Sequence, residues 1–316
     1  PPSPRPQGAS SPVGGCTAGA RVMNSTTVEV CSTIAAAAGV SGQAFSIDRA
    51  FGEQASTLEV FGSIRELVRT ASDGANVAVV AYGPSGSGKT HTMYGSIADQ
   101  GLVPRAAAEL LGSAPPEQQV RLSMLELHNE SLQDLLAPRG QPASPLEVRG
   151  GAGGAMATIE GAREVPGTSL VTLLAALRSG LSKRQVAATK SNLTSSRSHV
   201  IVVFKVGAGQ LTMVDLAGLE RVKRSGVEGL QLREAQSINR SLTSLGDVVD
   251  ALRRGASHVP VRNSRLARVM SGALGGGAET AMVVCLPAGG EKCDEAMSTL
   301  MFAERVRRIP SASGLR

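Results

Sequence analysis

One stretch of the sequence carries the clearest information about the fold: Val77-Ala78-Val79-Val80-Ala81-Tyr82-Gly83-Pro84-Ser85-Gly86-Ser87-Gly88-Lys89-Thr90. A short aliphatic run ends at a glycine, as expected for a buried strand. The following eight residues match G-x-x-x-x-G-K-[ST] in full. The glycines allow the backbone to wrap closely around phosphates, and the next helix points its positive end at the same place. Lys89 can reach the β- and γ-phosphates, and the Thr90 hydroxyl can coordinate Mg²⁺. The stretch therefore predicts a nucleoside triphosphate site.

Strands and helices alternate on both sides of this loop. Apolar runs predict strands at 77–82, 120–127, 200–206, 211–216 and 280–286, and the short turn after residue 206 predicts a hairpin. Helices are predicted at 58–69, 170–181 and 234–254. The last has one apolar stripe that ends at Gly255, made of Ile238, Leu242, Leu245, Val249 and Leu252. This alternation predicts an α/β domain of the P-loop NTPase type, with a mostly parallel or mixed central β-sheet between two layers of helices.

Composition limits the alternatives. The chain has 316 residues, and 42% hydrophobic residues are enough for a sizeable core, which excludes wholesale disorder. The apolar runs are far too short to span a membrane, so we expect no membrane partner. Residues 1–20 are rich in Pro, Gly and Ser and predict a flexible lead-in. We expect one domain at 21–309 and a short tail at 310–316. The cysteines show no dense framework, which favours reduced thiols and a cytoplasmic protein.

Two polar clusters follow the loop in the sequence. Asn192-Leu193-Thr194-Ser195-Ser196-Arg197-Ser198-His199 stands directly before a buried strand, and its hydroxyls can hold a metal ion or a water molecule. Asp215-Leu216-Ala217-Gly218-Leu219-Glu220 begins at the end of another strand, where P-loop enzymes keep the acid that binds magnesium through water. On composition alone, the first cluster is equally consistent with a solvated Ser-rich turn, and the second with an ordinary strand-end turn.

With these segments in view, the sequence resembles the motor domain of a kinesin. The resemblance rests on residues 81–93 around the loop, on N-x-x-S-S-R-S-H at 192–199 (switch I) and on residues 214–221 (switch II). Residues 238–242, 245–246 and 258–266 also fit, in the order of the family. Ser123-Met124-Leu125-Glu126 resembles the C-terminal-motor, minus-end-directed class. The likeness runs from about residue 28 to residue 308.

The resemblance implies a microtubule-stimulated ATPase that uses ATP and Mg²⁺ and carries ADP after hydrolysis. It implies nucleotide contacts from the loop and from His91 beside the adenine. Thr90 and Ser196 would bind magnesium directly, and Asp215 would bind it through water. Asn192, Ser195 and Ser196 would surround the γ-phosphate and the attacking water. Arg197 and Glu220 would form the salt bridge that closes the switches, and Gly218 would sense the γ-phosphate.

Three departures from the family pattern define an alternative. One is the first strand, whose R-x-R-P adenine-binding motif is poorly represented around Arg5-Pro6. Kinesins usually carry Gln-Thr where this chain has Pro84-Ser85, and Leu219 replaces the usual Ser. Pro84 removes one backbone N–H and fixes φ. The alternative is a microtubule-binding nucleotide switch with weak or no hydrolysis. A P-loop NTPase that is not a motor is a third reading, which the full switch I match argues against.

A basic segment follows the predicted long helix. The chain has a formal net charge of +6, and residues 251–278 contain no acid. The cations there and just after switch II are Lys223, Arg224, Arg253, Arg254, His258, Arg262, Arg265 and Arg268. Such a cluster attracts an anionic polymer or is simply a solvated face. The resemblance implies tubulin as the partner, hence a location on microtubules or the spindle. The scarcity of aromatic residues argues against nucleic acid. The chain has no coiled-coil heptads, which leaves dimerisation to segments outside it.

Overall fold

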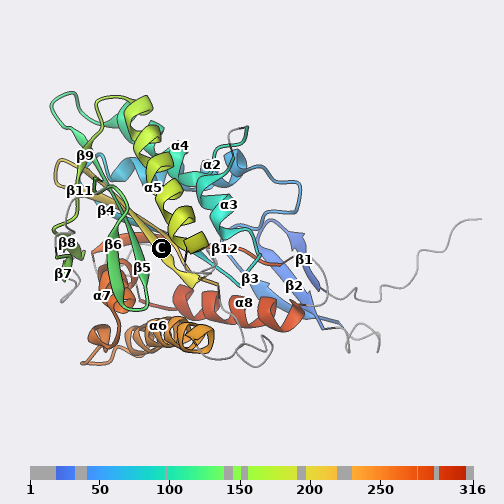
Figure 1. Cartoon of the computed structure of the whole chain (residues 1–316). Coiled ribbons are helices and arrows are strands. Elements are labelled where there is room, and N and C mark those ends of the chain that lie inside the picture. Colours follow the sequence, from blue (N-terminus) through green and yellow to red (C-terminus); the bar gives the residue numbers. More distant parts are fainter. Residues whose placement is uncertain are drawn as a thin grey trace, which may run out of the picture.

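The computed structural model describes residues 19–32, 41–96, 98–138, 145–150, 156–190, 197–218, 230–275, 277–287 and 292–310, with the backbone alone for 187–190 and 230–238. A mixed sheet lies at its centre, in the order β12-β4-β11-β10-β5-β6, with β9 also paired to β5 (Figure 1). The strands are β4 (Asn76–Tyr82), β5 (Val120–His128), β6 (Ser131–Asp134), β9 (Val165–Pro166), β10 (His199–Val206), β11 (Gly209–Asp215) and β12 (Ala278–Val284). β4 runs parallel to β11 and β12, whereas β10 is antiparallel to β11 and β5. The predicted mixed sheet and its β10–β11 hairpin are confirmed.

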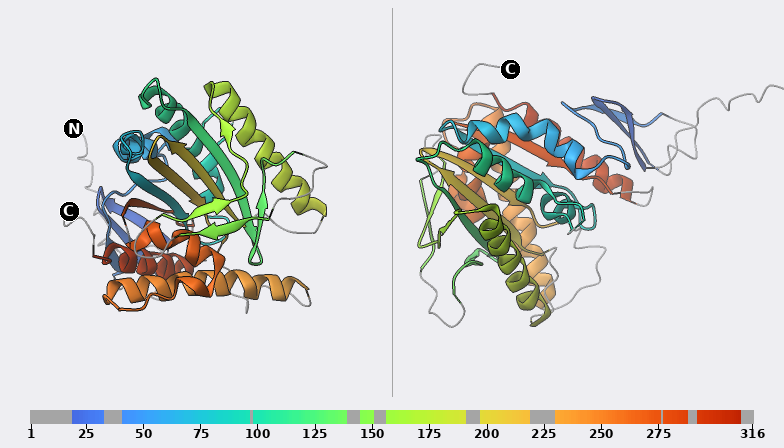
Figure 2. Two further views of the ribbon diagram at one scale, coloured as in Figure 1. Left: turned by 90° about the vertical axis from the view of Figure 1, so that its left-hand side faces the viewer. Right: turned by 90° about the horizontal axis from the view of Figure 1, so that it is seen from above.

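Helices cover both faces of this sheet (Figure 2). On one face lie α2 (Thr57–Thr70), α3 (Lys89–Tyr94), α4 (Leu102–Ser113) and α5 (Leu170–Lys190). On the other lie α6 (Leu230–Arg253), the short 3₁₀ helix η3 (Val261–Asn263), α7 (Arg265–Gly275) and α8 (Cys293–Arg307). The predicted three-layer arrangement is therefore confirmed.

The position of β4 at the centre of the sheet explains why residues 77–82, just before the loop, form a continuous apolar run. Val77, Val79 and Ala81 pack into the core under α2, α4 and α5. Ala78, Val80 and Tyr82 pack into the opposite core under α6, α7 and α8. Because successive side chains of a strand point to opposite faces, a strand buried on both faces needs a continuous apolar run.

The helix α6 confirms the predicted apolar stripe where side chains are described. Leu242, Leu245 and Val249 are buried, and the helix ends at Arg253, two residues before Gly255. Gly255 has a φ of 61°, the left-handed conformation that commonly ends a helix. Two other predicted ends were less accurate, since α5 extends to Lys190 and β12 lies two residues earlier than predicted.

A small antiparallel sheet lies beside α8 and was not predicted. It contains β1 (Gly19–Asn24), β2 (Thr27–Cys31) and β3 (Gln43–Ser46). Val28, Val30 and Phe45 pack against Ala296 and Leu300 of α8. β1 begins at Gly19, so the last two residues of the predicted lead-in belong to this sheet. Residues 1–18 and 311–316, the rest of the predicted lead-in and tail, lie outside the described residues.

Two further features complete the fold. The short strands β7 (Glu147–Arg149) and β8 (Thr158–Glu160) form a separate antiparallel pair. Among the described residues, β12 pairs with β4 on one edge and has no strand on its other edge. None of the described helices is both long and apolar enough to cross a lipid bilayer.

Candidate nucleotide site

The P-loop, residues 83–88, joins the carboxyl end of β4 to the start of α3. Gly83, Gly86 and Gly88 have φ angles of 153°, 76° and 92°, which residues with side chains rarely adopt. A Cβ atom on Gly83 would lie 2.1 Å from the Cys285 carbonyl oxygen, so no larger residue fits there. The glycines therefore allow a tight backbone shape that places the loop against β12.

Lys89 is buried against this loop. Its Nζ donates a hydrogen bond to the Pro84 carbonyl oxygen at 2.8 Å, and its side chain is only 7% exposed. Burial of an ammonium is costly unless polar or anionic groups surround it. A phosphate group bound in the loop would supply such a partner.

Thr90 and Asp215 meet at the end of the sheet although 125 residues separate them. The Thr90 Oγ1 donates a hydrogen bond to Asp215 Oδ2 at 2.8 Å. They come together because the parallel strands β4 and β11 end at the same edge, with Asp215 in register with Ala81. Burial raises the pKa of Asp215, whereas Arg184, Thr90 and Lys89 act in the opposite direction. The sequence predicted these two residues for one metal site, and the structure brings them together.

Three oxygen atoms at this edge test whether the residues fit a magnesium nucleotide. Asp215 Oδ1, Ser85 Oγ and Ser87 Oγ are buried and have no hydrogen-bond partner within the described part of the chain. Leaving a buried polar atom unpaired costs about 1–3 kcal/mol, so a site with several such atoms favours a polar ligand. Carboxylate and hydroxyl oxygens are also the ligands that Mg²⁺ prefers. The residues present therefore fit the predicted group.

Arg184 of α5 is a central residue that the sequence analysis missed. Its guanidinium lies 3.6 Å from the Asp215 carboxylate and 3.4 Å from that of Glu126. It also donates to the Ser198 carbonyl oxygen at 3.0 Å, and Ser198 Oγ donates to Glu126 at 2.5 Å. One signal could have found it, because Arg184 continues the buried spacing of Leu173 and Leu177 along α5. A charged residue on an apolar stripe is expected to have buried partners.

His199 links both switch segments to α6. Its Nδ1 accepts a hydrogen bond from the Ala217 N–H at 3.0 Å, so the proton of the neutral ring is on Nε2, which lies 3.2 Å from Ser241 Oγ. Burial, reinforced by the nearby charges of Arg184 and Lys89, lowers the pKa of His199 to about 3. The ring is therefore neutral at physiological pH and acts as a fixed hydrogen-bonding bridge.

Gly218 brings switch II against the P-loop. A Cβ atom at this position would lie 2.1 Å from Ser85 Oγ and 2.8 Å from the Ser85 backbone nitrogen. Only glycine permits this approach without displacing the loop. A small movement of the switch II backbone toward Ser85 would therefore displace the P-loop.

Comparison with known proteins decides what kind of P-loop domain this is. A family model described as the kinesin motor domain matches residues 5–309. The chain belongs to the kinesin motor domain family. Kinesin motor domains are P-loop ATPases, so the predicted family and enzyme class are confirmed at that level. The match begins within the predicted lead-in, at residue 5.

Curated kinesins show the same similarity along most of the chain. It is 40% identical to the kinesin-like protein KIN-14E of Arabidopsis thaliana over 83% of this chain and 22% of that protein. It is 36% identical to KIN-14O of Oryza sativa subsp. japonica, over 92% of this chain and 51% of that protein. The chain thus spans between about a fifth and a half of these relatives. The names agree with the predicted resemblance to the KIN-14, or C-terminal-motor, class.

A solved kinesin structure has the same fold. Its title is "Structure of a fast kinesin: Implications for ATPase mechanism and interactions with microtubules". The TM-score is 0.81 at 33% identity, with 93% of this chain and 86% of that chain covered.

Several predicted kinesin site residues are not open to description. Asn192, Ser195, Ser196 and Glu220 lie outside the described residues, as do Lys223 and Arg224. His91 is exposed on α3 beside the P-loop, as a residue facing a base would need to be. Arg197 is half-buried just before β10.

The predicted basic residues of the kinesin motor domain lie on the α6–η3–α7 side of the sheet. All six described basic residues are exposed, namely Arg253, Arg254, His258, Arg262, Arg265 and Arg268. Two acids border them, which the sequence pattern did not indicate. Asp250 lies 3.7 Å from Arg253, and Glu130 accepts a hydrogen bond from the Arg265 backbone N–H at 2.6 Å. The five arginines still outnumber these two acids.

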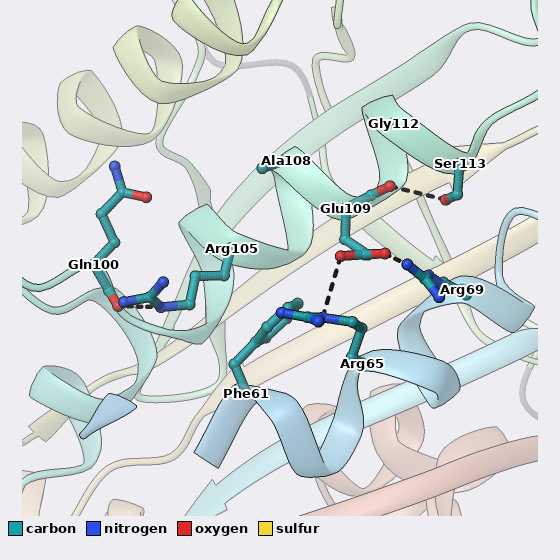
Figure 3. A pocket seen from close by; sticks show the side chains of 9 residues that line it. All are labelled: Phe61, Arg65, Arg69, Gln100, Arg105, Ala108, Glu109, Gly112 and Ser113. Atoms are coloured by element: carbon teal, nitrogen blue, oxygen red, sulfur yellow. Dashed lines mark hydrogen bonds and ion pairs between the residues drawn. The ribbon is translucent and has the colours of Figure 1, made fainter. Parts of the chain in front are cut away.

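A groove of about 560 Å³ between α2 and α4 is separate from this site (Figure 3). None of the predicted nucleotide residues lines it. Arg69 lies 2.5 Å and Arg65 lies 3.5 Å from the Glu109 carboxylate, and Arg105 donates to the Gln100 carbonyl oxygen at 2.8 Å. The two Glu109 pairs join α2 to α4.

Proposed function

We propose that this chain is a motor domain that hydrolyses ATP in a microtubule-stimulated manner and converts hydrolysis into movement along microtubules. The observation that carries the proposal is the meeting of Thr90, Asp215 and Arg184 at the end of the P-loop strand. This arrangement links phosphate binding to both switch segments. Because β1 begins at Gly19, we propose residues 19–309 as the motor domain, with a cytoplasmic location on microtubules.

Each residue of the site has a role in this proposal. The P-loop backbone and Lys89 bind the β- and γ-phosphates. Thr90 and Ser196 would hold Mg²⁺ directly and Asp215 would hold it through water, and the bound ion would supply neutralisation of phosphate charge. Asn192 and Ser195 position the attacking water. Phosphoryl transfer depends mainly on positioning and electrostatics, so the site needs no strong base.

The change at the phosphate reaches the track through the switches. Gly218 would sense the γ-phosphate, and Arg197 and Glu220 would form the salt bridge that closes the switches. His199 supports this coupling, because it contacts Ala217 of switch II and Ser241 of α6. A movement of switch II would therefore shift α6 and the exposed cations at its end, which we propose bind the acidic surface of tubulin.

The test is steady-state ATPase activity with and without microtubules. We expect turnover to rise many-fold when microtubules are added. Binding of nucleotide and of microtubules without any stimulation would reject the motor and support the alternative, a nucleotide switch with weak hydrolysis. That alternative is favoured by Pro84, which cannot donate an N–H to a phosphate. The double variant P84Q with L219S, which introduces the residues usual in kinesins, should then have a higher turnover.

For direction, we propose movement toward the minus end. The proposal is supported by Ser123-Met124-Leu125-Glu126 and by relatives that carry the KIN-14 name. A gliding assay on polarity-marked microtubules tests it with the chain fixed to the surface by its carboxyl end. Gliding with the plus end leading is the expected result, and gliding with the minus end leading would reject it.

A further inference from the structure

Two described residues, Cys285 just after β12 and Lys292 just before α8, lie against the P-loop. Cys285 donates its N–H to the Tyr82 carbonyl oxygen at 2.8 Å, and its own carbonyl fills the space beside Gly83. Lys292 Nζ donates a hydrogen bond to the Ser85 carbonyl oxygen at 3.2 Å. The same Nζ lies 3.7 Å from the position that a Gly86 Cβ atom would take. Lys292 therefore sits over the centre of the P-loop, although 207 residues separate it from Ser85.

The charges around the Lys292–Ser85 contact indicate that it does more than hold the loop in place. Residues 83–90 contain no acid, so no carboxylate of the loop attracts Lys292. The Ser85 carbonyl uses one of the three N–H donors of the ammonium. Lys89 is buried on the loop and bonded to Pro84, whereas Lys292 is exposed. The ammonium groups of Lys89 and Lys292, from distant parts of the sequence, thus flank the loop that is proposed to bind phosphates.

The position of Lys292 is fixed by the helix that it precedes. Lys292 is the N-terminal cap residue of α8, whose next residue, Cys293, is buried. Further along α8, the Phe302 ring stacks on Tyr82 with ring centroids 4.4 Å apart. Tyr82 directly precedes the P-loop, so α8 is anchored to the strand that carries the loop. A cation presented from an anchored helix loses less entropy on binding than one on a free chain.

From this geometry we propose that Lys292 is a second cation of the nucleotide site, a positioning residue that attracts the phosphates and stabilises the occupied P-loop. The inference rests on the proposed function, since it assumes that the loop binds a nucleotide. Lys292 takes no part in bond breaking. Its contribution is electrostatic and therefore falls as salt rises, because an exposed charge is screened over about 10 Å at 0.1 M salt.

The experiment measures the affinity of the full chain for fluorescently labelled ADP in Mg²⁺, at 50 mM and at 400 mM salt. We expect K292M to bind about two- to five-fold more weakly at low salt, as a partly exposed charge pair allows. The difference should largely vanish at high salt, and K292R should restore affinity. The control is K205M. It removes the same charge from a lysine on β10, whose Nζ lies 2.7 Å from the Glu164 carboxylate.

Each outcome has a distinct meaning. Equal affinity of K292M and the unchanged protein would overturn the role of Lys292, as would a loss that is the same at both salt concentrations or that K205M shares. A K292M protein that unfolds at a lower temperature without nucleotide would mark a structural role if K292R also failed to restore affinity. If the unchanged protein does not bind ADP at all, the proposed function fails instead.

Discussion

The Arg184 guanidinium lies 3.6 Å from the Asp215 carboxylate, and both side chains are almost completely buried. Burial alone raises the pKa of Asp215, and Arg184 is the strongest of the groups that oppose this rise. Arg184 also contacts Glu126 and the Ser198 carbonyl oxygen. The residue therefore ties α5 to the strand that follows switch I and to the start of switch II.

Removing this guanidinium should destabilise the fold. In R184M the carboxylates of Glu126 and Asp215 remain buried without their cation, which costs about 3–5 kcal/mol of unfolding free energy. Chemical denaturation measures this loss. The control is R178M, on the exposed side of the same helix, which should change the free energy by less than about 0.5 kcal/mol. A similar small effect in both variants would contradict the assigned role.

Adding one methyl group to Gly218 should uncouple the switches from the P-loop. In G218A the new Cβ would collide with Ser85, so switch II cannot approach the loop. We expect microtubule-stimulated ATPase activity to fall at least about tenfold, while ADP still binds. The control is G246A in α6, where the nearest atom outside the local helix backbone is 4.0 Å from the new Cβ. Normal turnover in G218A would rule out this contact as part of the switch.

Acid should weaken the fold through His199. Its pKa is about 3 in the folded state, against an ordinary value of 6.5, so the unfolded chain binds the proton more readily. The stabilising contribution is complete above pH 6.5 and is lost as the pH falls toward 3. Between pH 7 and pH 5 the unfolding free energy should fall by about 2 kcal/mol more in the unchanged protein than in H199N. Asp215, whose raised pKa acts in the opposite direction, is present in both proteins and cancels in the comparison. An identical pH response would show that His199 is not buried in the neutral form.

The exposed arginines near α7 should control microtubule affinity. In a double variant, R262A with R268A, we expect a several-fold higher microtubule concentration at half-maximal ATPase activity, and a larger effect at low salt. Turnover without microtubules should not change. The control is R21A with R49A, which removes the same charge from exposed positions elsewhere. Equal effects of the two double variants would reject a specific tubulin-binding face.

The sequence was most informative where one residue type serves one purpose. The strand 77–82 and the glycines at 83, 86 and 88 could be predicted because burial on two faces and positive φ angles restrict the choice of residue. The meeting of Thr90 and Asp215 could be predicted because P-loop enzymes keep the acid that binds magnesium through water at the end of a strand.

Contacts between distant segments were harder to predict. α8 meets the core through Cys293, Ala296, Leu300 and Phe302, which do not form the strong stripe of α6. The sheet of β1, β2 and β3 was missed because its strands are short and because β1 and β3 are mostly exposed. Lys292 and Arg184 owe their positions to tertiary packing, and no local pattern shows which partner such a cation will meet.

The nucleotide at the P-loop is proposed to control how tightly the domain binds microtubules. The sharpest test is co-sedimentation with microtubules in the non-hydrolysable ATP analogue AMP-PNP and in ADP. We expect tight binding in AMP-PNP, at least about tenfold weaker binding in ADP, and no difference between the two in K89A. Equal binding of the unchanged protein in both nucleotides would show that the P-loop does not control microtubule binding.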